Sequence, residues 1–334
     1  MMKHILLLAT GGTIASVKTE QGLVPNTTAE EILSYIPEAN NVCHLHVRQI
    51  LNIDSTNIQP EHWITIATEI QKEYNSYDGF VITHGTDTMA YTASALSYLI
   101  QNSEKPIIIT GAQRPISDAI TDATKNLMDS LRFAVKDNVQ GVYIVFDGKA
   151  IVGTRARKIR SKSYSAFESI NYPVAAFIDE TRILQYVETE RERKPPKFYH
   201  QLHPKVFVLK LIPGIEPEIL QYLSKHYDAI IIESYGVGGI PFHDNRNFFK
   251  ELEMMTKQGK IIVIATQVML EGSDAKVYEV GFKAITQYNV LQAYDMTIES
   301  ACVKLMWILG KTKNFTEVKE QFYHKINHDI LVLA

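Results

Sequence analysis

The sequence predicts an α/β fold: a larger N-terminal domain with a mostly parallel sheet and flanking helices, and a smaller C-terminal α/β domain. Short apolar runs rich in β-branched residues alternate with stretches of helical periodicity over most of the 334 residues. Runs bounded by Gly, Pro or Asp in this way are typical of strands buried on both faces of a parallel sheet. The chain also exceeds the usual size of one compact core, so two domains are expected.

The strands are expected where the apolar runs are short and richest in Val, Ile and Leu. In chain order these runs are residues 5–9, 80–83, 107–110, 142–146, 206–211, 230–232 and 261–265. Helices are expected between them. Pro60 suits a first helical turn, and Trp63, Ile66 and Ile70 then fall on one face. Gly259 is a suitable C-terminal cap for a later helix.

The domain boundary is expected where this alternation stops. Residues 188–197 (ETERERKPPK) are charged and end in two prolines, so they suit neither a helix nor a sheet. We therefore expect an N-terminal domain at residues 1–187, a linker at 188–204 and a C-terminal domain at 205–334.

The composition argues against several classes of protein. The formal net charge is −3, which gives no electrostatic reason to expect nucleic acid or an anionic membrane as partner. The two cysteines, Cys43 and Cys302, lack CxxC spacing, so a reducing compartment is expected in place of a disulfide framework or a zinc site. The apolar run at residues 5–9 is too short for a signal peptide. These features predict a cytoplasmic protein.

Chemistry-bearing residues follow the first expected strand. In an open parallel sheet, ligands bind beyond the carboxyl ends of the strands. Gly11 and Gly12 let the chain turn sharply there and place Thr13 in an exposed loop. The alternatives are a nucleotide-binding turn or simple strand punctuation, although the GxGxxG spacing of a dinucleotide fingerprint is absent.

A second segment, residues 83–88 (THGTDT), follows the next expected strand and precedes the helical run 89–99. Gly85 permits a close backbone approach, and Thr86 and Asp87 would lie at a helix N-terminus. The alternative is a plain Thr or Asp helix cap. His84 is expected to be structural, because the chain has no GxSxG nucleophile elbow.

Residues 155–162 (RARKIRSK) carry five cations in eight residues. Such a run is usually a solvated face or an anion patch. A lysine drawn into a cleft beside Thr86 and Asp87 would instead be a candidate proton acceptor, because desolvation favours its neutral form.

Together these segments resemble the bacterial-type L-asparaginase family, specifically its short cytoplasmic branch. Residues 83–91 (THGTDTMAY) are similar to the second signature of that family, and residues 10–15 (TGGTIA) to the first. Residues 235–239 (YGVGG) look like its glycine-rich loop at the start of the smaller domain. The similarity extends over essentially the full chain.

The resemblance implies roles for individual residues. Thr13 falls on the first catalytic threonine, in a flexible lid, and Thr86 on the second, with Asp87 beside it. The family lysine lies nine residues before a phenylalanine; counting back from Phe167 gives Lys158. Thr86, Lys158 and Asp87 would form a hydroxyl, base and orienting group of the kind found in Ser-His-Asp sites.

A set of substrate-binding residues is implied in the same way. Ser55 would contact the substrate α-carboxylate, Asp87 the α-amino group, and the backbone of Ala112 the side-chain amide. The full set is Asp54, Ser55, Thr56, Gly85, Thr86, Asp87 and Ala112.

The implied activity is the hydrolysis of L-asparagine to L-aspartate and ammonia by threonine-dependent acyl transfer. Weak glutaminase activity is also expected, because a pocket discriminates one methylene group by only ~10–200-fold. No cofactor or metal is expected, since the chain has no HExxH or clustered ligand spacing. The resemblance further implies a homodimer or homotetramer with each site at a subunit interface, and neither nucleic acid nor membrane as partner.

The sequence departs from the family in the lid. Leu23 stands where the family usually has a tyrosine, and leucine has no proton to exchange. Another group could replace the tyrosine, the enzyme could be slow, or catalysis could start at Thr86. The alternative function is an asparagine-binding sensor that lost turnover. A subunit of a tRNA-dependent amidotransferase shares the motifs but carries an extra N-terminal domain, for which Thr13 lies too near the start of the chain.

Overall fold

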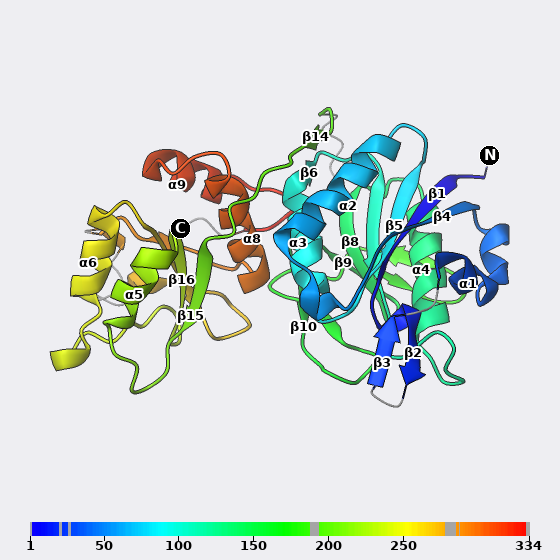
Figure 1. Cartoon of the computed structure of the whole chain (residues 1–334). Coiled ribbons are helices and arrows are strands. Elements are labelled where there is room, and N and C mark those ends of the chain that lie inside the picture. Colours follow the sequence, from blue (N-terminus) through cyan, green and yellow to red (C-terminus); the bar gives the residue numbers. More distant parts are fainter. Residues whose placement is uncertain are drawn as a thin grey trace. The chain divides into compact units, whose positions relative to one another are not determined.

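The computed structural model describes residues 2–19, 22–25, 28–187, 194–277, 285–286 and 288–331. The chain divides into two compact units, residues 1–200 and 201–334. Each unit has its own sheet and its own apolar core (Figure 1). The predicted α/β fold, with a larger, mostly parallel sheet followed by a smaller one, is confirmed.

The sheet of the N-terminal unit has eight strands in the order β13-β12-β9-β8-β7-β5-β1-β4. Strands β4, β1, β5, β7 and β8 are parallel, whereas β9, β12 and β13 join by antiparallel pairing. The strands are β1 (His4–Gly11), β4 (His44–Ile53), β5 (Gly79–Thr83), β7 (Pro106–Thr110), β8 (Gly141–Phe146), β9 (Lys149–Val152), β12 (Ala176–Ile178) and β13 (Ile183–Gln185).

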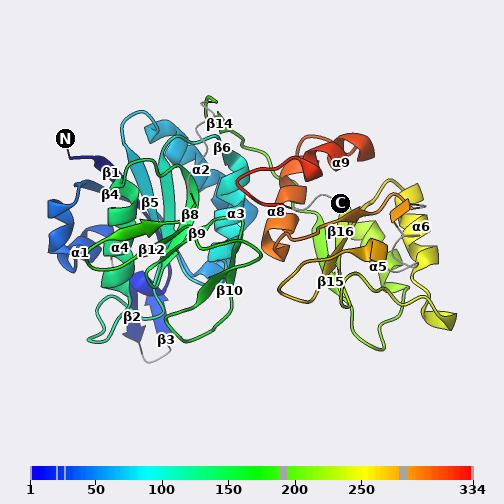
Figure 2. The same cartoon turned by 180° about the vertical axis from the view of Figure 1, so that it is seen from behind.

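Helices cover both faces of this sheet. Figures 1 and 2 show α2 (Pro60–Glu73) and α3 (Met89–Leu99) on one side, and α1 (Ala29–Ser34) and α4 (Ala123–Val135) on the other. Leu127 and Leu131 of α4 share a buried cluster with Leu7, Val81 and Ile108, which are paired in register on β1, β5 and β7. The residues next to them, such as Leu6, Phe80 and Ile109, face the other side of the sheet and are buried as well. Both faces of the central strands are therefore buried, which explains their continuous apolar sequences.

Small elements gather at the carboxyl end of the parallel strands. The hairpin of β2 (Ser16–Thr19) and β3 (Gly22–Pro25) and strand β10 (Ala156–Lys158) lie at this end of the sheet in both views (Figures 1 and 2). Strand β10 pairs with β11 (Phe167–Ser169). Two single 3-10 turns, η1 (Thr13–Ala15) and η3 (Ser55–Asn57), follow β1 and β4. A further pair, β6 (Ile100–Gln101) and β14 (Lys197–Phe198), follows α3.

The C-terminal unit contains a four-stranded parallel sheet in the order β15-β16-β17-β18. Its strands are β15 (Val206–Lys210), β16 (Ala229–Ser234), β17 (Ile261–Thr266) and β18 (Leu291–Gln292). Its helices are α5 (Ile219–His226), α6 (Phe249–Lys257), α8 (Ile298–Leu309) and α9 (Phe315–Tyr323). Over the described residues of the whole chain, no helix is both long and apolar enough to cross a bilayer.

All the predicted strands are present, as are helices α2 and α3 and the turn at Gly259 after α6, which has a φ of +76°. The edge strand β4 was not predicted. Its residues are mostly half-buried or exposed and include His44, His46 and Arg48, so it lacks the continuous apolar run of a central strand. The antiparallel strands β9, β12 and β13 are too short for a pattern of apolar residues to be recognised in the sequence.

Four loops at the carboxyl end of the sheet are in close contact through glycines. Gly12 has a φ of +81°, and a Cβ atom on it would lie 2.3 Å from the Gly85 nitrogen. A Cβ on Gly85 would lie 2.5 Å from the Ser55 Oγ, and one on Gly111 would lie 2.1 Å from the His84 carbonyl oxygen. Side chains cannot be accommodated at these positions, so the loops after β1, β4, β5 and β7 converge because glycine is present.

This contact predicts an unequal cost for two glycine substitutions. Gly12→Ala should destabilise the protein by about 3–5 kcal/mol, because it adds a steric clash to an unfavourable φ. Gly214 also has a positive φ, +99°, but no atom lies within 4 Å of the point that an added methyl group would occupy, so Gly214→Ala should cost only ~1–2 kcal/mol. Thermal unfolding midpoints followed by circular dichroism measure both. Equal losses would refute the close packing.

Candidate active site

Thr86 lies in the loop between β5 and α3, and its side chain is buried. Its hydroxyl accepts a hydrogen bond of 2.8 Å from the Lys158 Nζ and donates one of 3.3 Å to the Gln113 Oε1. The N-cap residue of helix α3 is Thr88, which forms no side-chain capping hydrogen bond. The helix-cap alternative for Thr86 therefore does not describe this loop, since its hydroxyl is bonded to Lys158 of β10 and to Gln113 of the loop after β7.

Lys158 is brought to this loop by β10. It pairs in register with Phe167 of β11, and its ammonium group donates to the Asp87 Oδ1 at 2.7 Å as well as to Thr86. The Lys158 side chain is 17% exposed and that of Asp87 is 56% exposed. Lys158 thus joins the Thr86 hydroxyl, 72 positions away in sequence, and the Asp87 carboxylate, 71 positions away, into one hydrogen-bonded group.

The loop after β4 lies against the same group. Ser55 is buried, and its Oγ accepts a 3.3 Å hydrogen bond from the backbone N–H of Asp87. Because the hydroxyl accepts this bond, its own proton remains available to a ligand carboxylate. Thr88 fixes the loop further, since its hydroxyl donates to the Ser55 carbonyl at 2.7 Å.

Asp54 and Thr56 form the frame of this loop. The Asp54 Oδ1 accepts 2.8 Å hydrogen bonds from both the backbone N–H and the hydroxyl of Thr56, and so caps the turn η3. The two side chains are thus hydrogen-bonded to each other, and both residues are exposed.

Thr13 is placed next to the group by the glycine contact. It immediately follows Gly12, and Thr86 immediately follows Gly85, so the two touching glycines bring both threonines to one point at the sheet edge. Thr13 is half-buried and begins the turn η1. Leu23 pairs with Lys18 in the β2–β3 hairpin, but its side chain lies outside the described part of the structure.

Ala112 and Gln113 follow β7, and the second of these was not predicted from the sequence. Ala112 is buried, which is compatible with the role that the resemblance implies for its backbone. Gln113 bonds Thr86 with its carbonyl oxygen and donates from Nε2 to the Ser163 carbonyl at 3.1 Å. Its position directly after Ala112 was the one signal in the sequence, but no residue-type pattern distinguishes a glutamine in a loop.

Two buried side chains, one at the start of α4 and one within it, hold this loop in place. The Asp122 carboxylate accepts the backbone N–H of Gln113 at 2.9 and 3.0 Å and that of Arg114 at 3.1 Å. Asn126 donates to Asp122 at 3.2 Å and to the Gly111 carbonyl at 3.0 Å. Burial raises the pKa of Asp122, while its hydrogen bonds act in the opposite direction.

His84 is structural in this arrangement. Its Nδ1 lies 2.7 Å from the Gly85 carbonyl and its Nε2 lies 2.9 Å from the Thr92 hydroxyl, which also accepts from the Trp63 indole at 2.9 Å. A carbonyl only accepts, so Nδ1 carries a proton. Burial lowers the pKa of His84 to about 4, so near neutral pH the Nε2 is unprotonated and accepts from the Thr92 hydroxyl. The ring therefore holds the Thr86 loop against α3.

The two cysteines have no reactive character. Both are free and buried, and burial raises the pKa of Cys43 to about 11 and that of Cys302 to about 12. The thiols therefore remain protonated near neutral pH. Among the described residues, no group of three or more His, Cys, Asp and Glu side chains is arranged to hold a metal ion.

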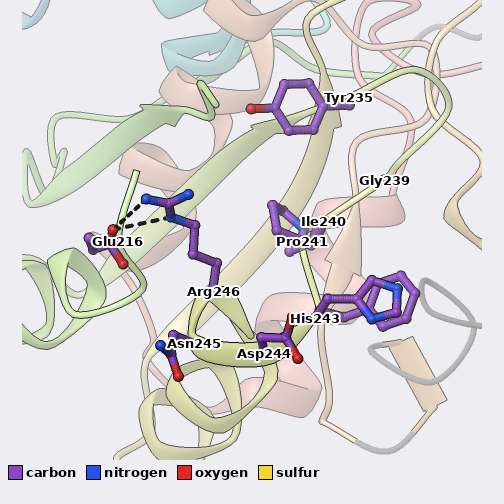
Figure 3. Close-up of a pocket in the computed structure, with 10 residues that line it drawn as sticks. Glu216, Tyr235, Gly239, Ile240, Pro241, His243, Asp244, Asn245 and Arg246 are labelled. Atoms are coloured by element: carbon purple, nitrogen blue, oxygen red, sulfur yellow. Dashed lines mark hydrogen bonds and ion pairs between the residues drawn. The ribbon is translucent and has the colours of Figure 1, made fainter. Parts of the chain in front are cut away.

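A hollow of about 750 Å³ lies in the C-terminal unit and is separate from these residues (Figure 3). Arg246 forms an exposed ion pair with Glu216 at the margin of the hollow. The Tyr235 hydroxyl, for which the described residues offer no hydrogen-bond partner, points to the side on which Glu216 lies. None of the predicted catalytic or substrate-binding residues lines the hollow. The predicted catalytic residues lie instead at the sheet edge of the N-terminal unit.

Comparisons with known proteins agree with the two-unit organisation. Residues 4–191 match the family described as asparaginase, N-terminal, and residues 205–322 match the glutaminase/asparaginase C-terminal domain. A curated L-asparaginase from Thermococcus kodakarensis is 40% identical over 98% of each chain. The D subunit of the glutamyl-tRNA(Gln) amidotransferase of Pyrococcus abyssi is 35% identical over 96% of this chain and 75% of its own.

Solved structures show the same similarity. The thermostable L-asparaginase from Thermococcus kodakarensis superposes with a TM-score of 0.92 at 39% identity, covering 99% of this chain and 100% of that one. L-asparaginase I from Vibrio cholerae has a TM-score of 0.89 at 31% identity, with the same coverage.

The buried His84 predicts a loss of stability in acid. Burial lowers its pKa from 6.5 to about 4, against a smaller raising effect of the Gly85 hydrogen bond. Between these values the unfolded chain binds a proton that the folded chain does not, so the free energy of unfolding should decrease by ~3 kcal/mol as the pH falls from 6.5 to 4. His84→Gln removes this titration and should flatten the dependence.

The measurement is urea unfolding at pH 7 and pH 4.5, followed by the fluorescence of Trp63 in a Trp307→Phe background. Trp63 lies in the N-terminal unit and touches the His84 network. If wild type and His84→Gln lose the same free energy of unfolding between the two pH values, the imidazole of His84 is not buried in its neutral form.

Proposed function

This chain belongs to the asparaginase family and is an amidohydrolase, and we propose that it hydrolyses L-asparagine to L-aspartate and ammonia. The observation that carries the proposal is the contact of the Lys158 ammonium with both the Thr86 hydroxyl, at 2.8 Å, and the Asp87 carboxylate, at 2.7 Å. An unactivated amide needs a hydroxyl nucleophile, a base and an orienting group, and this cluster supplies all three.

The reaction is proposed to proceed by threonine-dependent acyl transfer. Neutral Lys158 accepts a proton, either from the Thr86 hydroxyl or from the Thr13 hydroxyl by way of Thr86. The oxygen of the threonine that has lost its proton then bonds to the side-chain amide carbon. The carbon–nitrogen bond then breaks, and the amide nitrogen leaves as ammonia with the transferred proton. Water hydrolyses the resulting ester, which releases aspartate and restores the hydroxyl. Thr13, which follows the glycine in contact with Gly85, supplies the second hydroxyl.

The substrate is proposed to lie between the loops that carry Ser55, Asp87 and Ala112. Ser55 has a free proton to donate to the α-carboxylate, and the half-exposed Asp87 carboxylate can bind the α-ammonium. The backbone around Gly85 and Ala112 would contact the side-chain amide. Asp54 and Thr56 would act by holding the turn that presents Ser55.

The remaining properties rest on the resemblance and on composition. We propose a cytoplasmic homodimer or homotetramer that uses no cofactor and binds neither nucleic acid nor membrane, with weak glutaminase activity as a side reaction. Exposed apolar residues at the carboxyl end of the C-terminal sheet, among them Ile212, Val268 and Leu270, support self-association.

Two other functions remain as competitors. A sensor that binds asparagine without turnover is favoured by Leu23 in the lid. A role within a glutamyl-tRNA(Gln) amidotransferase is favoured by the 35% identity to the D subunit of the Pyrococcus abyssi enzyme. The 40% identity to an L-asparaginase over 98% of both chains supports the hydrolase instead.

The hydrolase predicts that the purified chain alone releases ammonia from asparagine, and more slowly from glutamine. Thr86→Ala should reduce kcat by about 10³-fold or more, because it removes the hydroxyl that contacts Lys158. Thr65→Ala, on the exposed side of α2, is the matched control and should leave turnover unchanged. Ammonia release is followed with a coupled dehydrogenase assay.

The competitors give different results in the same experiment. Calorimetric binding of asparagine without ammonia release would establish the sensor. Release that requires the other amidotransferase components would establish the amidotransferase role. Full activity in Thr86→Ala would contradict the proposed mechanism.

Leu23 predicts a gain of function. If the lid limits turnover for want of a phenol, Leu23→Tyr should raise kcat by about tenfold or more, within the range for restored general acid–base catalysis. Leu23→Phe is the matched control, because it supplies the ring without the hydroxyl. Steady-state assays with asparagine compare the three proteins. Unchanged turnover in Leu23→Tyr would show that the lid does not limit the rate.

A further inference from the structure

Four groups at the candidate site form a hydrogen-bonded chain with a single direction. The Lys158 ammonium donates to the Thr86 hydroxyl at 2.8 Å, Thr86 donates to the Gln113 Oε1 at 3.3 Å, and the Gln113 Nε2 donates to the Ser163 carbonyl at 3.1 Å. An ammonium group can only donate and a carbonyl can only accept. The two ends therefore fix the direction of every bond between them, including the orientation of the Gln113 amide.

This direction determines where the Thr86 proton lies. While Lys158 is protonated, it occupies a lone pair of the Thr86 oxygen, and the Thr86 proton has to point to Gln113. For Lys158 to accept a proton from Thr86, that proton must turn away from Gln113. The carbonyl oxygen of Gln113 then loses its donor. Transfer of the Thr86 proton to Lys158 therefore requires the Thr86–Gln113 bond to break.

Gln113 is held firmly enough to have this effect. Its backbone N–H is bonded to both carboxylate oxygens of Asp122, at 2.9 and 3.0 Å, and Asp122 is only 7% exposed. Asn126, which is 1% exposed, ties Asp122 to the Gly111 carbonyl. The far end of the Gln113 amide is bonded to Ser163, in the loop that joins β10, which carries Lys158, to β11.

We propose that Gln113 is a positioning residue that accepts the Thr86 proton while Lys158 is protonated, stabilises that arrangement, and so helps to set the pH at which the pair becomes reactive. It acts through Thr86 and Lys158 and does not itself react. The kinetic consequence rests on the proposed asparaginase function. Lys158 also donates to the Asp87 carboxylate at 2.7 Å, which favours its protonated form alike in wild type and variants, so the effect of Gln113 on the protonation of Lys158 can be measured by comparison and without turnover.

Two substitutions separate the parts of this role. Gln113→Met keeps the length of the side chain and removes both amide bonds. Gln113→Glu keeps an acceptor for the Thr86 proton, adds a negative charge that favours protonated Lys158, and loses the donor to Ser163. Protonated Lys158 requires Thr86 to donate to Gln113, whereas with neutral Lys158 the Thr86 proton can be donated to the amine instead, so the Thr86–Gln113 bond stabilises the protonated form relative to the neutral one. Loss of this bond should therefore lower the pH at which Lys158 becomes neutral, and a stronger acceptor should raise it.

The experiment is trace labelling with acetic anhydride over a pH series, with mass spectrometry of the peptide that contains Lys158. Because the Thr86–Gln113 bond is long, the midpoint of labelling should fall by about half a pH unit in Gln113→Met. It should rise in Gln113→Glu, whereas the exposed Lys72 should label alike in all three proteins. An unchanged midpoint in a folded Gln113→Met, verified by circular dichroism, would overturn the proposal.

Turnover gives an independent reading when the wild type is active. The acidic limb of kcat/KM against pH should move in the same direction as the labelling midpoint in each variant. In Gln113→Met, KM for asparagine should stay within about twofold, and kcat should fall by about tenfold because Thr86 loses an orienting bond. A rise in KM alone would make Gln113 a substrate contact and overturn the positioning role. A wild type without turnover would refute the proposed function while the labelling result still decides this inference.

Discussion

The candidate site depends on close contact, made possible by glycines, between loops that follow four neighbouring parallel strands. Gly12 lies against Gly85, Gly85 against Ser55, and Gly111 against the His84 carbonyl, each closer than a side chain would permit. Parallel strands end at one edge of a sheet, but the loops that follow them diverge unless the backbones can touch. The glycines therefore bring Thr13, Thr86 and Ser55 together, although the three residues share no helix and no strand.

The chemistry of the site then follows from a few directional bonds on this frame. The Lys158 ammonium connects a buried hydroxyl to a half-exposed carboxylate, and a neutral, buried His84 secures the loop below. Burial lowers the pKa of His84 and suppresses its charge, since no counter-ion is present among the described residues. An amine beside both a hydroxyl and a carboxylate is the arrangement that hydroxyl-based acyl transfer requires.

The parts predicted from the sequence are those that depend on local pattern. Buried central strands have continuous apolar runs, and the two threonine motifs lie at strand ends where periodicity stops. Lys158 was located only through the family resemblance, because nothing local distinguishes it from the cations around it. Gln113, Asp122 and the edge strand β4 were not predicted. The roles of Gln113 and β4 arise from partners distant in sequence, such as Thr86, which lies 27 positions from Gln113. Asp122 bonds backbone groups eight and nine positions away, in a loop that has no regular pattern to predict it.

The central claim is that a threonine of this cluster becomes covalently acylated. It is tested most directly by acid-quenching the enzyme during turnover of asparagine and mapping its peptides by mass spectrometry. The account predicts an aspartyl ester on the peptide that contains Thr13 or on the one that contains Thr86, absent when asparagine is omitted. Ammonia release with neither peptide modified, under a quench that preserves a reference threonyl ester, would contradict threonine-dependent acyl transfer.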